Sequence, residues 1–294
     1  MSKLMIYNLI KKAEEADKAV EEAHKTGNYI KAKNTYQELY DLFKCELGEK
    51  HPTTLNSLNN LAIFYSDLED YNKACELQNE VYNARKEILG EKHPDTLDSL
   101  NNLAITYSSL GDYNKACKLQ NAVYNARKEI LGENHPDTLS ALHNLAITYS
   151  YLGDYNKACK LQNAVYNARK EILGENHPDT LASLNNLANS YSDLGDYNKA
   201  LEMKNAVYNA RKEILGETHP DTLLVLSNLL VSQIHQDKTD NEFIKNYMIA
   251  YFENINNLKT TAFSIKEVSS RRNYLVSFNR VYRQYEMTRR KQKK

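Results

Sequence analysis

Apolar residues recur at helical spacing along most of the chain, in segments that short polar turns separate. In residues 93–110, Leu97, Leu100 and Leu103 lie three positions apart, and residues 113–131 carry a second stripe of this kind. Spacings of three and four positions place apolar side chains on one face of an α-helix. The pattern therefore predicts two amphipathic helices joined by a tight turn.

Proline and glycine mark where these helices begin and end. All five prolines follow a histidine, and all nine glycines lie in one of two turn sequences. Pro94 suits the first turn of a helix, where its missing N–H costs nothing. Gly111 and Gly132 end the two helices. Ala104 and Ala116, both small, are expected where the two helices approach most closely.

This helical hairpin is repeated in tandem. Residues 93–134 return at 135–176 with four of 42 positions changed, and the His-Pro pair recurs at 51, 93, 135, 177 and 219. A period of this length indicates a solenoid, in which each unit buries its apolar face only against its neighbours. We expect six hairpins and a final helix at about 264–290.

The pattern Leu-x-x-Leu-Ala-x-x-Tyr-x-x-x-Gly-Asp-Tyr-x-x-Ala resembles the tetratricopeptide repeat. The longer second helix, ending Arg-Lys-Glu-Ile-Leu-Gly-Glu-x-His-Pro-Asp-Thr, is similar to the 42-residue repeat of kinesin light chains. The resemblance implies an all-α, tetratricopeptide-type solenoid of helical hairpins wound as a right-handed superhelix. Its expected parts are a degenerate N-terminal repeat or cap at 1–50, four repeats at 51–218, a degenerate repeat at 219–258, and a capping helix with a basic tail at 259–294.

The distribution of charge limits which classes of ligand the chain is expected to bind. The chain has 38 basic and 38 acidic residues, which gives no overall attraction to nucleic acid or anionic lipid. Residues 260–294 hold ten basic residues against Glu267 and Glu286, so 271–294 could bind an anionic membrane or nucleic acid with the repeats as a spacer. The other reading is a capping helix with a solvated basic face. The lack of a long apolar run or signal peptide leads us to expect a cytoplasmic protein.

Residues suited to catalysis or metal binding do not converge in the sequence. Five histidines precede the five prolines, one per unit, and ligands in a row cannot meet at one metal centre. We interpret them as polar residues before helix starts. The cysteines at 45, 75, 117 and 159 are expected to be small buried residues, too far apart for disulfides. With no known catalytic motif, we expect a non-enzymatic chain with no catalytic residue, metal or cofactor.

Paired polar residues inside the first helices are the candidate binding site. Asparagine is a poor helix-interior residue, so a contact should compensate for it. The pairs are Asn59-Asn60, Asn101-Asn102, His143-Asn144, Asn185-Asn186 and Ser227-Asn228. An asparagine amide can donate to and accept from the backbone of an extended peptide whatever its sequence. The alternative is that each asparagine bridges neighbouring first helices.

A row of arginines late in the second helices is the other candidate: Arg85, Arg127, Arg169 and Arg211. The resemblance to kinesin light chains implies that this arginine and the asparagines face a groove for acidic, aromatic-containing peptides. Arginine pairs well with carboxylates, but a basic residue near a helix C-terminus is also favoured by the helix dipole alone. We expect a scaffold or adaptor that binds an extended, possibly acidic, peptide segment of a partner protein.

Near-identical units differ only in their first helices. The four differences are Asp98/Ser140, Ser99/Ala141, Asn101/His143 and Ser109/Tyr151. The resemblance to tetratricopeptide repeats implies that the first helices line the inner face. Variation confined to that face is what ligand selectivity would produce, and drift at exposed sites would look the same.

Overall fold

The computed structural model describes residues 3–26, 29–217 and 219–235, and these residues form only α-helices and short connections. The helices are α1 (Lys3–Thr26), α2 (Tyr29–Leu47), α3 (Pro52–Asp67), α4 (Tyr71–Leu89), α5 (Pro94–Leu110), α6 (Tyr113–Leu131), α7 (Pro136–Tyr151), α8 (Tyr155–Leu173), α9 (Pro178–Asp193), α10 (Tyr197–Leu215) and α11 (Pro220–His235). The boundaries predicted for 93–134 are confirmed. The helix expected at 264–290 lies outside the described residues.

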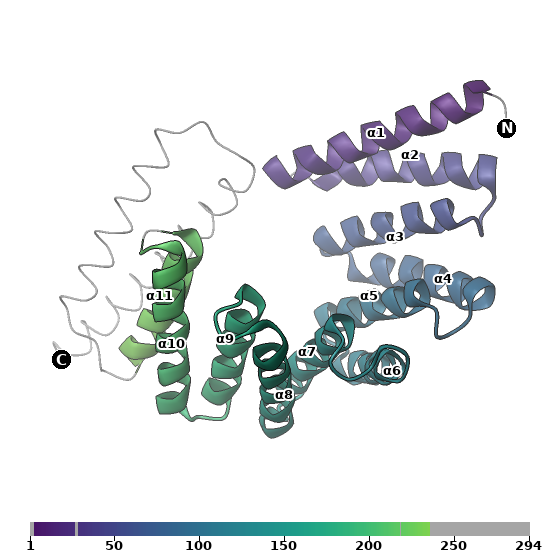
Figure 1. Ribbon diagram of the computed structural model, residues 1–294. Coiled ribbons are helices and arrows are strands. Elements are labelled where there is room, and N and C mark those ends of the chain that lie inside the picture. The colour runs from purple at the N-terminus through teal and green to yellow at the C-terminus, as the bar shows by residue number, and fades with distance from the viewer. Residues whose placement is uncertain (1–2, 27–28, 218, 236–294) are drawn as a thin grey trace, which may run out of the picture. The chain divides into compact units, whose positions relative to one another are not determined.

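The chain divides into two compact units, residues 1–158 and 159–294. In the first unit each of α1 to α6 packs against the next helix in sequence, and α5 also touches α7 (Figure 1). In the second unit α9 packs on α10, and α10 on α11. Consecutive packing of helical hairpins confirms the tetratricopeptide-type solenoid. The finer division at residues 50, 218 and 258 stays a prediction.

The His-Pro pairs begin the first helices by a specific capping contact. In α5 the Nδ1 atom of His93 accepts a hydrogen bond of 3.2 Å from the backbone N–H of Asp95, and Pro94 follows in the first turn. The same contact begins α3, α7, α9 and α11. Each contact satisfies one of the N–H groups that a helix start leaves open. The histidines thus act as N-caps.

The turn between the two helices of a hairpin requires a left-handed residue. Gly111 has φ 87° and ends α5, and Asp112 then caps α6 by accepting from the N–H of Lys115 at 3.1 Å. In the α3–α4 hairpin the equivalent residue is Glu69, which holds φ 64°. A side chain in this conformation is strained, because its Cβ approaches the following carbonyl oxygen.

The core of a central hairpin is built from leucines around small residues. Ala104 and Ala116 are both fully buried, as predicted for the close approach of α5 and α6, and Leu100, Leu103 and Val123 are buried with them. Hairpins are also linked by polar contacts. The Tyr107 hydroxyl accepts from Lys115 Nζ at 2.6 Å and from Asn79 Nδ2 at 3.3 Å, so α4, α5 and α6 meet at one phenol.

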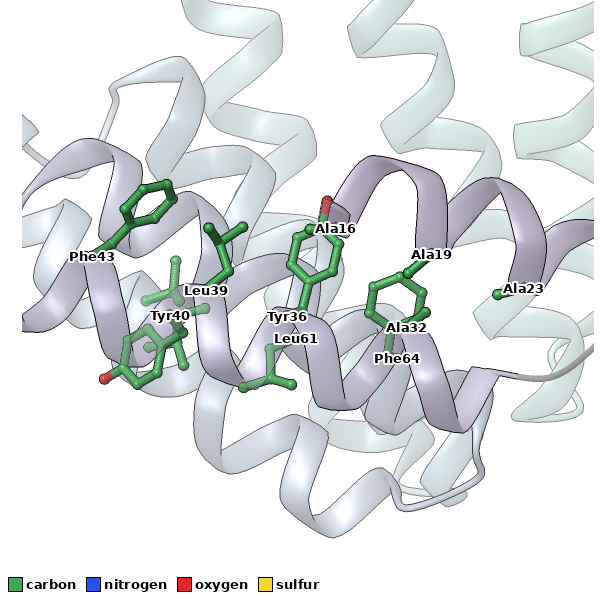
Figure 2. Packing of buried hydrophobic residues seen from close by; sticks show 12 residues of the cluster. Ala16, Ala19, Ala23, Ala32, Tyr36, Leu39, Tyr40, Phe43, Leu61 and Phe64 are labelled. Carbon is green, nitrogen blue, oxygen red and sulfur yellow. The ribbon is translucent and has the colours of Figure 1, made fainter. Parts of the chain in front are cut away.

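The N-terminal hairpin uses a different core. Alanines of α1, among them Ala16 and Ala19, face large rings from the following helices (Figure 2). Tyr36 and Phe64 lie with ring centroids 5.2 Å apart. On its buried face α1 thus carries alanines against bulky aromatic residues, where the first helices of the later units carry leucines.

The cysteine prediction is partly wrong. Cys75 and Cys159 are buried, but Cys117 is only half-buried and Cys45 is exposed. Cys45 lies near the end of α2, two residues after the last core residue, Phe43. All four are free thiols, as expected. Among the described residues, no helix is long and apolar enough to cross a membrane.

Candidate functional site

The polar pairs lie on one continuous stripe of the first helices. On each helix the stripe takes five positions, at i, i+3, i+4, i+7 and i+11, which lie on one face of the helix. In the first unit these are Asn56, Asn59, Asn60, Ile63 and Asp67 on α3, Asp98, Asn101, Asn102, Ile105 and Ser109 on α5, and Ser140, His143, Asn144, Ile147 and Tyr151 on α7. All fifteen are half-buried or exposed, and we call this surface the first-helix face.

Asparagines link neighbouring first helices across this face. Asn102 Nδ2 donates to Asn59 Oδ1 at 3.3 Å, and Asn144 Nδ2 donates to Asn101 Oδ1 at 3.2 Å. The two contacts join α5 to α3 and α7 to α5 at one repeat position. The bridging interpretation is confirmed for these pairs. In the N-terminal part, Asn60 Nδ2 donates instead to the Tyr36 hydroxyl of α2 at 3.5 Å.

Each of these asparagine links, which we call rungs, uses only half of each amide. In the rung between α7 and α5, the Nδ2 of Asn144 and the Oδ1 of Asn101 are engaged. The Oδ1 of Asn144 and the Nδ2 of Asn101 have no hydrogen-bond partner within the described part of the chain, and both residues are half-buried. One rung therefore leaves one acceptor and one donor open toward the face, so bridging and ligand binding are compatible.

Isoleucines form an exposed row beside the rungs. Ile63, Ile105 and Ile147 are 39%, 44% and 38% exposed at equivalent positions of α3, α5 and α7. Sequence analysis missed them, although each lies three and four residues after an asparagine or histidine of the pair and so on the same helical stripe. The face combines open amide groups with apolar contact area.

The arginines of the first unit are engaged within the protein. Arg85 is 8% exposed, and its guanidinium donates to the Asp95 carbonyl at 3.1 Å, to Ser99 Oγ at 2.8 Å and to Asn56 Oδ1 at 2.5 Å. These contacts tie α4 to both neighbouring first helices. Burial lowers the pKa of Arg85, which the carboxylates of Asp95 and Asp98 partly oppose.

Arg127 repeats this arrangement with a carboxylate. Its guanidinium donates to the Asp137 carbonyl at 3.2 Å and forms an ion pair with Asp98, the first position of the first-helix face on α5. The position three residues before the asparagine pair, Asn56 on α3 and Asp98 on α5, is thus where Arg85 and Arg127 dock. Both arginines of the first unit therefore have donors committed to holding hairpins together.

In the second unit the predicted residues occupy equivalent positions. Asn185, Asn186 and Asn228 are half-buried, and the Oδ1 of Asn185 is buried with no hydrogen-bond partner within the described residues. Arg169 donates to Ser183 Oγ at 2.9 Å and Arg211 to the Asp221 carbonyl at 3.2 Å, each reaching the next first helix. That any of the thirteen predicted residues contacts a ligand stays a prediction.

Metal ligation has no support among the residues that the structure describes, where no three His, Cys, Asp or Glu side chains cluster. The Nδ1 atoms of the five repeated histidines accept from backbone N–H groups, which positively explains their recurrence. The absence of catalysis and of cofactors stays a prediction.

Comparisons with known proteins agree with this architecture. The tetratricopeptide repeat model matches residues 21–87, 54–128, 108–158 and 151–213. A crystal structure of a kinesin light chain-type protein from Podosopora anserina, with nearly identical TPR-like repeats, has a TM-score of 0.63 and 26% identity, and the match covers 73% of this chain and 98% of that one. A comparison with curated protein sequences finds no significant match.

Two further solved structures are similar in fold alone. The apo form of RapI has a TM-score of 0.63 at 16% identity and matches 98% of both chains. BtubC from P. vanneervenii has a TM-score of 0.58 at 19% identity and covers 73% of this chain and 94% of that one. The family model covers well over half of the sequence. The chain therefore belongs to the tetratricopeptide repeat family, in its kinesin light chain-like type, and has the fold of a protein–protein interaction scaffold.

Proposed function

We propose that the chain binds an extended segment of a partner protein along the first-helix face of α3, α5 and α7. The observation that carries this proposal is the half-used rung. Asn102 and Asn144 each donate to a neighbouring helix and keep a carbonyl oxygen open, and Asn101 keeps an open Nδ2. An open donor beside an open acceptor matches the C=O and N–H of a peptide backbone.

The spacing of the rungs suits an extended chain. Packed helices lie roughly 8–10 Å apart, and an extended peptide advances about 3.3 Å per residue. A bound segment would therefore meet a new rung about every third residue. Residues between rungs would place side chains against the exposed row of Ile63, Ile105 and Ile147.

In this proposal, acidic residues of the bound segment are not the main source of its affinity for the chain. Arg85 is buried, and Arg127 already pairs with Asp98. A ligand carboxylate would have to compete with these internal contacts. We assign Arg85 and Arg127 to positioning the first helices, while the backbone and apolar contacts hold the segment.

Two predictions from the sequence do not concern the first-helix face. The alternative site for membrane or nucleic acid, 271–294, lies outside the described residues. A cytoplasmic location remains an expectation from sequence.

The test starts from random 12-residue peptides selected for binding to the full chain. Changing both Ile105→Ser and Ile147→Ser should weaken the selected peptides by at least tenfold, because two exposed apolar contacts are lost while little core packing is disturbed. The matched control is Ile88→Ser with Ile130→Ser, which alters equally exposed isoleucines at the ends of α4 and α6. A loss in the control but not in the test variant would refute the proposed face.

The asparagines are tested by the double variant Asn102→Ala and Asn144→Ala. Each lost hydrogen bond is worth about 0.5–1.5 kcal/mol, so peptide affinity should fall by roughly 30-fold if the two effects add. Circular dichroism separates this loss from unfolding. A folded variant with unchanged affinity would show that the rungs serve only to join helices.

A further inference from the structure

A pocket opens on the first-helix face between α5 and α7. Its volume is about 410 Å³, and Ile105 and Ile147 form apolar walls. The rings of Tyr113 and Tyr151 also line it and stack with centroids 5.0 Å apart and an angle of 11° between their planes. Every side chain that lines the pocket among the described residues is uncharged. A charged ligand group would find no counter-ion there.

A residue that lines this pocket carries an unsatisfied acceptor. Gln120 of α6 lines it and is only 2% exposed, and its Oε1 has no hydrogen-bond partner within the described part of the chain. A buried carbonyl oxygen without a donor is costly, so a ligand that supplies an N–H gains from satisfying it.

A donor is available in the same pocket. Ser108 Oγ and Thr148 Oγ1 lie 3.2 Å apart, and one of these hydroxyls donates to the other. The hydroxyl that accepts retains its own O–H, which can donate to a ligand. The pocket therefore offers one acceptor and one donor between apolar and aromatic walls.

We propose that this pocket receives a carboxamide side chain, from asparagine or glutamine, of the segment bound on the first-helix face; the inference rests on the proposed function. A carboxamide supplies an N–H for Gln120 and a C=O for the free hydroxyl, and its flat group can lie against the tyrosine rings. A carboxylate cannot donate to Gln120 and would be buried without a cation. An aliphatic side chain satisfies neither group, and an indole supplies only the donor.

Tyr151 makes the pocket particular to this hairpin. At the equivalent positions the chain has Asp67, Ser109 and Asp193. The ring that closes the pocket is thus one of the four differences between the two most similar units. We infer that this substitution sets the specificity of the face at this point.

The test uses the full chain labelled with ¹³C at isoleucine methyl groups. Four probe peptides, acetyl-Ala-Ser-Ala-Xaa-Ala-Ser-Ala-amide with Xaa glutamine, glutamate, leucine or tryptophan, are titrated while the Ile105 and Ile147 methyl signals are followed. The glutamine peptide should bind at least tenfold more tightly than the other three. Gln120→Leu should abolish this preference, and Tyr151→Ser should weaken it several-fold. Gln78→Leu changes the equivalent buried glutamine of α4 and is the control. It should leave the preference for the glutamine peptide unchanged.

The outcomes separate this inference from the proposed function. Equal affinity of all four peptides, tighter binding of the leucine or tryptophan peptide, or no binding by any of them overturns the carboxamide pocket. Peptides selected from the random library then decide the rest. If these peptides perturb the Ile63, Ile105 and Ile147 methyl signals but show no preference for a carboxamide, the proposed function stands and the carboxamide pocket is refuted. If they leave all three methyl signals unperturbed, both proposals fail.

Discussion

The α5–α6 and α9–α10 hairpins share most of their sequence but bury different chemistry at one position. Gln120 of α6 is 2% exposed, and the equivalent residue of α10 is Lys204, 6% exposed. The first-helix residue that accompanies them changes from Ser109 to Asp193. Burial raises the pKa of Asp193, and the nearby charge of Lys204 opposes this shift. The repeat thus keeps its backbone while exchanging a neutral acceptor for a pair of charges.

The largest expected effect comes from introducing the lysine of α10 at the equivalent position of α6 without the aspartate that accompanies it. Gln120→Lys places a buried ammonium group where no acidic partner accompanies it, which should lower the free energy of unfolding by on the order of 3 kcal/mol. Urea denaturation would measure the loss. Adding Ser109→Asp should recover part of it, and equal stability of the single variant and wild type would contradict the comparison.

Packing at the hairpin crossing should be the same in both regions. Ala104 and its equivalent Ala188 are each fully buried, so Ala104→Leu and Ala188→Leu should each cost about 1–3 kcal/mol by overpacking. Ala122→Leu on the exposed side of α6 is the control. A thermal midpoint unchanged by Ala104→Leu would show that the two helices do not approach closely there.

The turn of the α3–α4 hairpin differs from the turns of the α5–α6 and α9–α10 hairpins, because its left-handed residue is not glycine. Glu69 holds φ 64° where the other hairpins have Gly111 and Gly195 with φ 87° and 85°. Glu69→Gly should therefore stabilise the protein by about 1 kcal/mol, since it relieves the left-handed strain. Conversely, Gly111→Ala should destabilise it, although space is open around that position. Denaturation midpoints that move in the opposite directions would refute this account of the turn.

The smallest effect concerns pH. Because the folded pKa of Asp193 is raised, the folded state favours the protonated form, and stability falls as pH rises from about 4 through the folded pKa. Asp193→Asn should remove this part of the pH dependence. Urea midpoints measured across this range would show it, and a slope unchanged by the substitution would argue against a raised pKa of this carboxyl group.

The sequence predicted helix boundaries well because they depend on local chemistry. Pro94 and Gly111 act within one turn of themselves, and the histidine that precedes each proline explains its own recurrence as an N-cap. The repeat also predicted that Ala104 is buried, since neighbouring units present the same apolar face.

The sequence could not predict contacts that depend on the register between helices. The pairing of Asn102 with Asn59 joins residues 43 positions apart and follows only from how α5 packs on α3. The burial of Gln120 and the exposure of Ile105 run against their polarity, because the packing geometry and not side-chain type decides which side of the helix faces the core. Periodicity alone placed the asparagines on one face without showing that half of each amide is used.

The most direct test of the asparagine rungs is a scan of backbone nitrogens in a peptide selected from the random 12-residue library. Methylating one backbone nitrogen at a time removes its hydrogen and leaves the side chains unchanged. We expect several-fold losses of affinity that recur about every third residue, and that disappear in the Asn102→Ala and Asn144→Ala double variant. Uniform tolerance of methylation, or losses with no such period, would contradict a ladder of asparagines that holds a peptide backbone.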